Sequence, residues 1–308
     1  MWLLILQEML GFLVMMLIGA LAARCRLITD AGLDSMNTLA QKVFLPIMVF
    51  TFTYRSLSID ALSQHWQMMP LAACFYSVTI VLTHVLSKAL RLSGAKASAF
   101  RMVFTFGNTG FIGLPMLSTV FAESGVVNLL MFMVVDQLVL WTYGIREASK
   151  PSSRPSVRKS LRGLFNPNII AFALGFAVTV VGVDIPPFVE GTLESLGAVA
   201  SPFCMVCLGC LCLSSKMGSV LAQPELYAGI AIKMVALPIA CMPLLLKLDL
   251  GGDIVPSLLL MMAMPTTTLV PLVVASEGGD RQYATRMSIA TIVASTFTVP
   301  LIAAVIGG

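Results

Sequence analysis

One stretch in the first half of the chain carries polar side chains where a membrane-spanning helix normally carries none. It reads FGNTGFIGLP, residues 106–115, and lies inside an apolar segment of roughly residues 98–122. Pro115 has no backbone N–H, and its ring would collide with the carbonyl of Phe111, so we expect the helix to break near here. Backbone freed by a break is tolerated in a membrane only where it is buried in protein or lines a wet cavity. The stretch is therefore predicted to form half of a substrate site.

A second interrupted segment lies in the other half of the chain, where residues 254–276 are apolar except for MPTTT at 264–268. If the two broken helices meet near the middle of the bilayer, their N-terminal ends present free N–H groups and partial positive charge, which suits an anion. Glycine lets backbone approach the ligand, and the amide and hydroxyl groups add neutral donors. A small organic anion fits this set better than a sugar or a bare cation. The predicted substrate-binding residues are Asn108, Thr109, Gly110, Pro115, Pro265, Thr266, Thr267 and Thr268.

Three charged residues inside apolar segments are candidates for coupling or charge compensation. Asp136 and Lys233 lie about halfway along their segments. An ionised group at that depth costs a few kcal/mol, so each should face a cavity or a partner. Either the two form a buried structural pair, or Lys233 attracts the anion while Asp136 carries a coupling proton. Glu8, near the outer end of the first segment, either binds a proton or ion or reaches interfacial water.

Four of the seven cysteines crowd one segment, namely Cys204, Cys207, Cys210 and Cys212. The Cys-x-x-Cys spacing is that of a metal ligand set. However, the stretch lies in mid-span with no nearby histidine and no loop to wrap a cluster. We therefore interpret these residues as small side chains that pack against a neighbouring helix, and we predict neither a metal nor a cofactor.

Composition places these residues in an integral membrane protein. Of 308 residues, 58% are hydrophobic and 11% are charged, against about 25% charged in soluble domains, and the mean hydropathy is +0.93. This pattern predicts an all-α fold with ten transmembrane helices. No room is left for a catalytic or nucleic-acid-binding module, so we expect neither an enzyme nor a nucleic-acid partner. The predicted segments are 3–23, 36–54, 67–87, 98–122, 125–145, 167–183, 193–215, 226–246, 254–276 and 284–306.

The segments divide into two halves of five around a hydrophilic linker at residues 147–163. An odd number of spans inverts the second copy, so residues 1–146 (helices 1–5) and 164–308 (helices 6–10) are predicted to be inverted repeats. The fourth segment of each half is interrupted, so helices 4 and 9 are expected to be broken and to cross. Paired broken helices in inverted repeats indicate the substrate site of a secondary transporter.

The distribution of basic residues predicts the orientation in the membrane. Loops after the odd-numbered segments hold most of them, and these are Arg24, Arg26, Lys88, Arg91, Lys96, Arg101, the run from Arg146 to Arg162, Lys216, Arg281 and Arg286. By the positive-inside rule these loops and the linker are cytoplasmic and both termini lie outside. The first segment has its charges after the apolar run, so we expect it to remain as a helix and not to be cleaved.

Several stretches resemble the auxin efflux carrier family. The run from Gly107 to Pro115 resembles its "N-T-G-F-x-G-x-P" signature, and further similar stretches are Asn37 to Pro46, Trp141 to Gly144, Asn166-Pro167, Lys233 to Pro238, Ala263 to Pro265 and Glu277 to Asp280. The resemblance implies a ten-helix fold related to bile acid–sodium symporters, in which helices 4 and 9 cross at their prolines and a transport domain moves like an elevator against a scaffold. By position, Asn108, Pro115 and Pro265 would belong to the crossover. Thr266 to Thr268 depart from the commoner Pro-Pro or Pro-Ala-x-Asn pattern.

Together these observations predict a secondary active transporter in a bacterial-type inner membrane. Its substrate would be a small organic anion, a carboxylate that is malonate- or malate-like or auxin-like, coupled to protons or to the membrane potential. One alternative is a sodium-coupled symporter of a bile-acid-like anion, although no cluster of acids and amides for sodium is evident at both breaks. Another is a ligand-binding sensor that does not transport. Small residues suggest a homodimer interface, namely Gly11, Gly19, Gly175 and Gly182.

Overall fold

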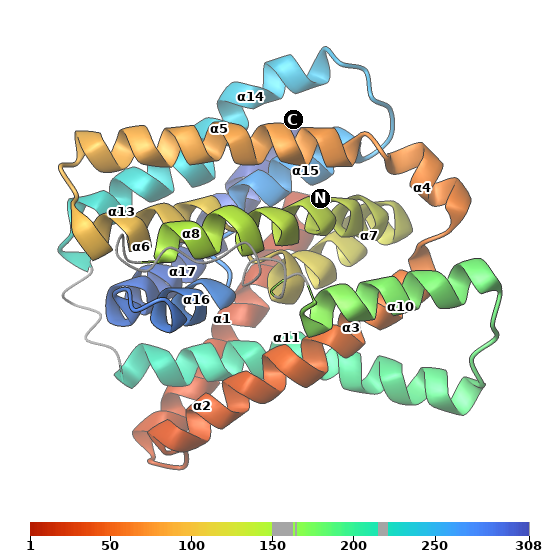
Figure 1. Cartoon of the computed structure of the whole chain (residues 1–308), viewed down its shortest axis with the longest axis horizontal. Helices are drawn as coiled ribbons and strands as arrows, with labels where there is room; N and C mark the ends of the chain where they lie inside the picture. Colours follow the sequence, from red (N-terminus) through yellow and green to blue (C-terminus); the bar gives the residue numbers. More distant parts are fainter. Residues whose placement is uncertain (150–162, 164, 215–220, 308) are drawn as a thin grey trace.

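The computed structural model describes residues 1–149, 163, 165–214 and 221–307, and every element in that part of the chain is helical (Figure 1). The all-α membrane prediction is confirmed to this extent. Most of the predicted linker 147–163 lies outside the described residues, as does Lys216. Within the described chain, six helical stretches are long and apolar enough to cross a membrane, and these are Trp2–Arg24, Met68–Ala89, Thr109–Ala148, Pro187–Cys212, Pro224–Leu246 and Arg281–Gly307. Two shorter apolar helices are Pro167–Val181 and Ile254–Ala263.

The elements follow one another in two series, in which η marks a π-helical segment. The first series is α1 (Trp2–Arg24), α2 (Asp30–Leu39), η1 (Ala40–Phe44), α3 (Leu45–Ser56), α4 (Ile59–His65), α5 (Met68–Ala89), α6 (Gly94–Thr105), η2 (Thr109–Gly113), α7 (Leu114–Val139), η3 (Leu140–Gly144) and α8 (Ile145–Ala148). The second series is α10 (Pro167–Val181), α11 (Pro187–Ser214), α13 (Pro224–Gly229), η4 (Ile230–Ala236), α14 (Leu237–Leu246), α15 (Ile254–Ala263), α16 (Leu269–Ser276) and α17 (Arg281–Gly307).

Three of the π-helical segments are followed directly by a Leu-Pro pair. The α-helices that begin after η1, η2 and η4 have Pro46, Pro115 and Pro238 at their second position. Proline removes one i→i−4 hydrogen bond and crowds the carbonyl four residues earlier, and a π turn re-pairs the backbone with a wider spacing. After η2, for example, the N–H of Leu114 donates to the carbonyl of Thr109. These prolines therefore widen a continuing helix and do not end it.

The interruption predicted near Pro115 consequently lies earlier than the proline. Helix α6 ends at Thr105, and Phe106 has an extended backbone with φ −102° and ψ 123°. The chain re-enters a helix at Thr109 through the π turn. The break is thus confined to residues 106–108, where Gly107 and Asn108 lie.

Helix α7 contains a reversal that separates two apolar stretches. Ala122 has φ 48° and ψ −131°, inside an element otherwise helical from Leu114 to Val139. A Cβ on Gly125 would lie 2.6 Å from the carbonyl oxygen of Leu117, so only glycine allows the two arms to approach so closely. The reversal coincides with the predicted boundary between segments 98–122 and 125–145.

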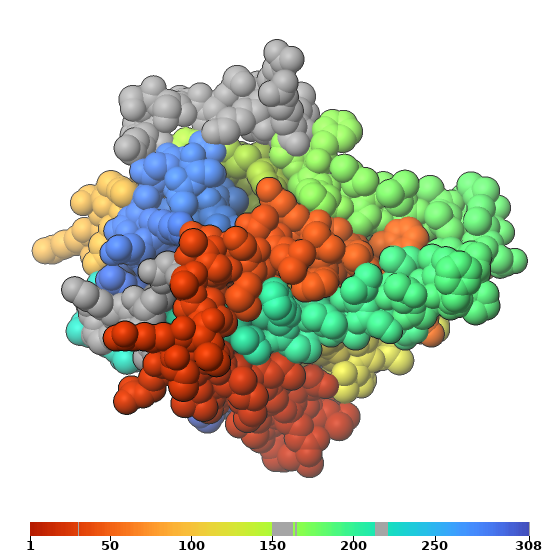
Figure 2. All heavy atoms as spheres, turned by 90° about the horizontal axis from the view of Figure 1, so that it is seen from below, coloured from red at the N-terminus to blue at the C-terminus, as the bar shows by residue number. Residues whose placement is uncertain are grey.

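The helices form two groups. The panel consists of α1–α3, α10 and α11, in which α1 and α3 pack on α11 and α10 packs on α3. The core consists of α5–α8 and α13–α17, in which α15 packs on α7 and α17 packs on α6 and α16. Figure 2 shows the panel face, with α1–α3 (red to orange), α11 (blue-green) and α10 (green) side by side. The groups meet where α1 contacts α17 and α3 contacts α7.

The panel is held together by very close helix packing. A Cβ on Gly19 would lie 2.0 Å from the carbonyl oxygen of Val206, and one on Gly209 would lie 1.9 Å from that of Met16. The buried thiol of Cys210 donates to the carbonyl of Gly19 at 3.1 Å. The cysteine-rich stretch therefore packs α11 against α1, as interpreted from the sequence.

Two of the glycines suggested for a homodimer interface contact other helices of the same chain. Gly19 packs on α11, and Gly175 packs α10 against Phe50 and Thr53 of α3. A Cβ on Gly182 would meet no atom within 4 Å, but this residue has φ +71° and ends α10. These contacts bind the panel together and leave Gly19 and Gly175 no free surface for a partner chain.

Candidate functional site

The two breaks meet and pair through their backbones. The N–H of Asn108 donates to the carbonyl of Pro265 at 2.7 Å, and the N–H of Thr267 donates to the carbonyl of Phe106 at 3.2 Å. Between these bonds, Gly107 and Thr266 form an isolated antiparallel bridge. Backbone groups inside a membrane protein must find partners internally. Each break supplies the partners that the other lacks.

Asn108 caps the helix after the first break and leaves a donor over. Its side-chain Oδ1 accepts a hydrogen bond from the N–H of Phe111 at 3.2 Å. The residue is 1% exposed, and its Nδ2 is buried with no acceptor among the described residues. Buried polar atoms are nearly always satisfied in proteins, so an orphaned donor indicates a missing partner such as a ligand or water.

Thr266, at the second break, is engaged by neighbouring helices. Its hydroxyl donates to the carbonyl of Val103 in α6 at 2.7 Å. Its N–H donates to Oγ1 of Thr291 in α17 at 3.2 Å, and the two hydroxyls lie 3.0 Å apart. This side chain therefore bonds the second break to α6 and α17, and its hydroxyl proton is not available to a ligand.

The remaining predicted binding residues line the same junction in different ways. Thr267 Oγ1 accepts from the N–H of Leu269 at the start of α16 at 3.4 Å. Thr109 and Thr268 are buried. A Cβ on Gly110 would lie 2.9 Å from Cδ1 of Leu45, so η2 rests against the panel at this point. The predicted residues of the two breaks therefore lie at one junction, but they make different structural contacts there.

The two mid-depth charges lie beside different breaks. Asp136 accepts hydrogen bonds from the Tyr76 hydroxyl and from Nε2 of Gln137, the latter at 3.0 Å. The Tyr76 ring lies 5.8 Å from the ring of Phe106 at the first break. Lys233 Nζ donates to the carbonyl of Met264 at the second break at 2.7 Å. Among the described residues, Asp136 and Lys233 thus have separate partners and form no ion pair with each other.

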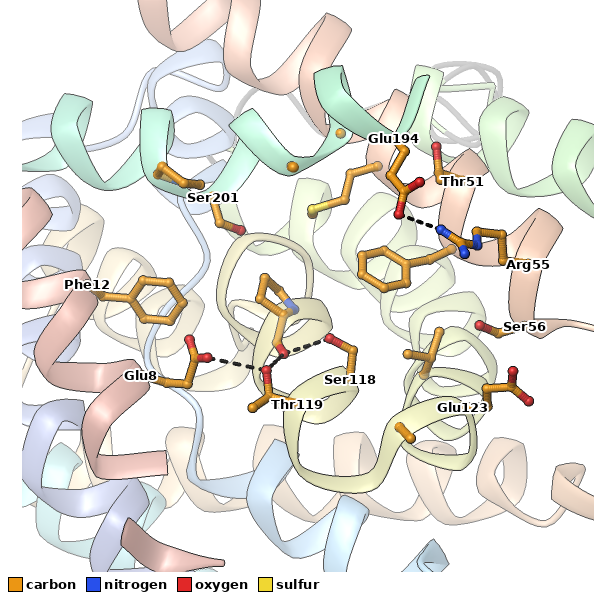
Figure 3. Close-up of a pocket in the computed structure, with 18 of the residues that line it drawn as sticks. Glu8, Phe12, Thr51, Arg55, Ser56, Ser118, Thr119, Glu123, Glu194 and Ser201 are labelled. Carbon is orange, nitrogen blue, oxygen red and sulfur yellow. Dashed lines mark hydrogen bonds and ion pairs between the residues drawn. The ribbon is translucent and has the colours of Figure 1, made fainter. Parts of the chain in front are cut away.

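A cavity of about 590 Å³ lies between the panel and α7, and we call it the first seam cavity (Figure 3). Its charged and polar lining includes Glu8, Thr51, Arg55, Ser118, Thr119, Glu123, Glu194 and Ser201. The hydroxyl of Thr119 in α7 lies 3.3 Å from Oε1 of Glu8 in α1, so this contact crosses from core to panel. On the panel side of the cavity, Arg55 of α3 pairs with Glu194 of α11 at 2.5 Å.

Two of the predicted site residues, Glu8 and Pro115, line the first seam cavity, whereas Asn108 and the threonines of the second break are not among its lining residues. Ser201 connects the two places. It lines the cavity, and its hydroxyl donates to the carbonyl of Phe111. Phe111 is also the residue whose N–H Asn108 caps. Ser201 therefore links the lining of the cavity to the residue that Asn108 caps.

A second seam cavity of about 510 Å³ lies between the panel and α16. Its lining includes Lys42 of η1, Asn168 of α10 and Glu277 after α16. Asn168 is 7% exposed, and its Oδ1 has no donor among the described residues. The two seam cavities thus lie against α7 and α16, the helices that follow the first and second breaks.

Sequence reasoning did not assign Tyr76, Ser201 or Thr291 to the site. Each carries a hydroxyl group within an apolar segment, and such hydroxyls commonly bond to the backbone of their own helix. Their roles depend on which helix lies opposite, which a single sequence does not reveal. The clustering of hydroxyl residues in α17, which includes Ser288, Thr291 and Ser295, was the one available signal for Thr291.

Comparison with known proteins gives the family. A family model described as membrane transport protein matches residues 4–303. An uncharacterised transporter from Methanothermobacter thermautotrophicus is 22% identical over 204 residues, which are 66% of this chain and 66% of that protein. The match therefore spans slightly less than two thirds of that relative. The family is one of membrane transporters and not of enzymes. With its apolar helices, this chain is a multi-pass membrane protein that belongs to the membrane transport protein family, the family of the auxin efflux carriers.

Proposed function

We propose that this protein is a secondary active transporter of a small organic anion, a mono- or dicarboxylate of malonate-, malate- or auxin-like size. One observation carries the proposal: Asn108 Nδ2 is a buried donor without an acceptor among the described residues, at the junction of two broken helices. Leaving such a donor unpaired costs about 1–3 kcal/mol. A carboxylate oxygen is the acceptor that satisfies it. The helix starts at Thr109 and Leu269 add partial positive charge at the same junction.

The architecture we propose is ten spans in two inverted repeats, residues 1–146 and 164–308, with helices 4 and 9 crossing at the breaks. The equivalence of the two halves supports it. In each half, the first two spans belong to the panel. These spans are α1 and α2–α3 in the first half, and α10 and α11 in the second half. The broken span in each half, α6–α7 or α15–α16, belongs to the core.

The mechanism we propose is elevator-type alternating access, in which the core slides along the panel. The two seam cavities support this, because each lies between the panel and the helix that follows one break. By the positive-inside rule the second seam cavity, with Lys42 at its lining, faces the cytoplasm. The first then faces outside, together with both termini. An anion held at the breaks would be exposed first to one cavity and then to the other.

For coupling we propose protons or the membrane potential. Glu8 is the acid that faces the moving core, because its contact with Thr119 joins the panel to α7. Asp136 is a buried acid of the core that lies next to the first break through Tyr76.

The test is transport by the purified protein in proteoliposomes, with labelled mono- and dicarboxylates under imposed pH, sodium and potassium-diffusion gradients. We expect accumulation that follows the pH gradient or the potential and is the same in sodium and choline. Accumulation that follows sodium alone would favour symport of a bile-acid-like anion. Saturable binding without flux would identify a sensor and contradict transport.

A further inference from the structure

The second break contains a buried cation that the proposed anion site does not explain. Lys233 is 2% exposed, and its Nζ donates to the carbonyl of Met264 at 2.7 Å. Met264 directly follows α15 and has φ −61° and ψ 144°, so its carbonyl belongs to the unwound backbone. A buried ammonium without compensation is very costly, and the carbonyl of Met264 is the acceptor that it contacts.

The compensation comes from the end of a helix and not from an acid. The last carbonyls of α15 lack intrahelical partners and carry about half a negative charge. Two buried acids of the core have other partners: Asp136 is bonded to Tyr76 and Gln137, and Glu225 pairs with Lys96. No ion pair of Lys233 with a carboxylate occurs among the described residues. The ammonium therefore donates to a carbonyl at the end of a helix, which is a setting that suits a monovalent cation.

In transporters with broken helices, unwound carbonyls and half-helix C-terminal ends coordinate the coupling sodium ion or proton. Here the same kind of setting is filled by a side chain of the protein. In addition, the carbonyl of Pro265, the residue after Met264, accepts from the N–H of Asn108. The carbonyl that accepts from Lys233 therefore belongs to the residue directly before Pro265, whose own carbonyl joins the second break to Asn108.

We propose that Lys233 is a tethered cation that takes the place of a mobile sodium ion at the second break and holds the break in shape for the anion. Lys233 is thus a positioning residue, acting through the carbonyls of Met264 and Pro265. Its role in an anion cycle rests on the proposed function, whereas the presence of a cation site at this break does not.

The first experiment measures flux of the wild-type protein and of Lys233→Met, which keeps the length of the side chain and removes its charge. We expect wild-type flux to be equal in sodium, potassium and choline. We expect Lys233→Met to weaken apparent anion affinity roughly 10-fold, within the usual range of coupling between two sites. Lys88→Met, at an exposed position on α5, is the control for loss of a lysine elsewhere. Sodium-dependent wild-type flux, or normal affinity in Lys233→Met, would overturn the proposal.

The second experiment does not need a substrate. Lys233→Ala leaves space at the site, and thermal unfolding of the purified variant is followed with added propylammonium or sodium chloride, with choline chloride as the ionic-strength control. We expect propylammonium or sodium to raise the Tm of Lys233→Ala but not that of Lys233→Met or the wild type. No shift for either cation would overturn the cation site. If the wild type transports none of the anions but Lys233→Ala is stabilised, the proposed function fails and the tethered cation stands.

Discussion

The backbone N–H of Asn108 donates to the carbonyl of Pro265 at 2.7 Å, and this bond joins the two halves of the chain at their breaks. Thr267 returns a second bond to Phe106. Because backbone at membrane depth has few other partners, the two breaks are stable only together. Three polar groups lie beside this pairing: the Nδ2 of Asn108, which has no acceptor among the described residues, the bonded hydroxyl of Thr266 and the Nζ of Lys233.

Asn108 caps a helix and is proposed to bind the anion, and one substitution distinguishes the two roles. Asn108→Ser keeps an oxygen at the cap position that can accept the N–H of Phe111, but removes the Nδ2 donor without burying a charge. Loss of a hydrogen bond to a charged group costs about 1.5–3 kcal/mol. We expect apparent anion affinity to fall roughly 10- to 100-fold while the Tm changes little, measured by transport kinetics and thermal unfolding.

The control for this pair of roles is Asn108→Ala, which removes both the cap and the donor. It should lose anion affinity and also stability, because removal of a helix cap costs about 1 kcal/mol. Normal anion affinity in Asn108→Ser would show that the ligand lies elsewhere.

Thr266 and Thr291 should act as one unit in stability. Their hydroxyls lie 3.0 Å apart, and Thr291 also accepts the N–H of Thr266. Side-chain hydrogen bonds between helices in a membrane contribute about 0.6 kcal/mol and at most about 1.7. We expect Thr266→Val and Thr291→Val each to destabilise by such amounts and the double variant by less than their sum, measured in a double-mutant cycle.

The control for the threonine cycle is Thr192→Val, because Thr192 is exposed and its hydroxyl bonds only to Phe188 on the same helix. It should combine additively with Thr266→Val. Strict additivity between Thr266 and Thr291 would contradict the contact.

Two glycines of α11 should respond in opposite ways to the same substitution. A Cβ on Gly209 would lie 1.9 Å from the carbonyl of Met16, so Gly209→Ala must push α1 away from α11. Overpacking of this kind costs about 1–3 kcal/mol. A Cβ on Gly191 would meet nothing within 4 Å, and alanine there gains up to about 1 kcal/mol in helix propensity. Thermal unfolding of both variants checks the prediction, and equal Tm values would refute the close packing of the panel.

An exposed ion pair should bias the position of the core. Arg281, at the start of α17, lies 2.8 Å from Asp34 of α2, so the pair joins core to panel. Exposed pairs contribute about 0.2–1 kcal/mol, which changes the ratio of two conformations roughly 1.5- to 5-fold. If alternating access is correct, Arg281→Glu should reduce the labelling rate of a cysteine placed at Ser118 in the first seam cavity.

The labelling experiment requires a background in which the exposed Cys25 and Cys74 are replaced. Charge exchange, Asp34→Arg with Arg281→Glu, should restore the labelling rate, and high salt should reduce the difference between variants. An unchanged rate in Arg281→Glu would show that this pair does not hold the core in place.

Much of the helix pattern was predictable, because long apolar runs leave few alternatives. Helices α1 and α5 begin and end within a few residues of the predicted segments 3–23 and 67–87. The position of the first break was less predictable. Proline suggested a break at Pro115, but a π turn accommodates the missing N–H, and the chain unwinds earlier at residues 106–108. Whether proline breaks or widens a helix depends on its neighbours in space.

By itself, the sequence determined that this is an all-helical membrane protein and which two stretches are unusual, because apolar length and misplaced glycine, asparagine and proline are local properties. Only the tertiary structure decided which polar groups remain available at those stretches. Thr266 and Asn108 look equally suitable as donors in the sequence. In the fold, Val103 and Thr291 satisfy Thr266, whereas Asn108 Nδ2 has no acceptor among the described residues. The reason is that hydrogen bonding at this junction depends on which helices lie opposite, and those helices are not neighbours in the sequence.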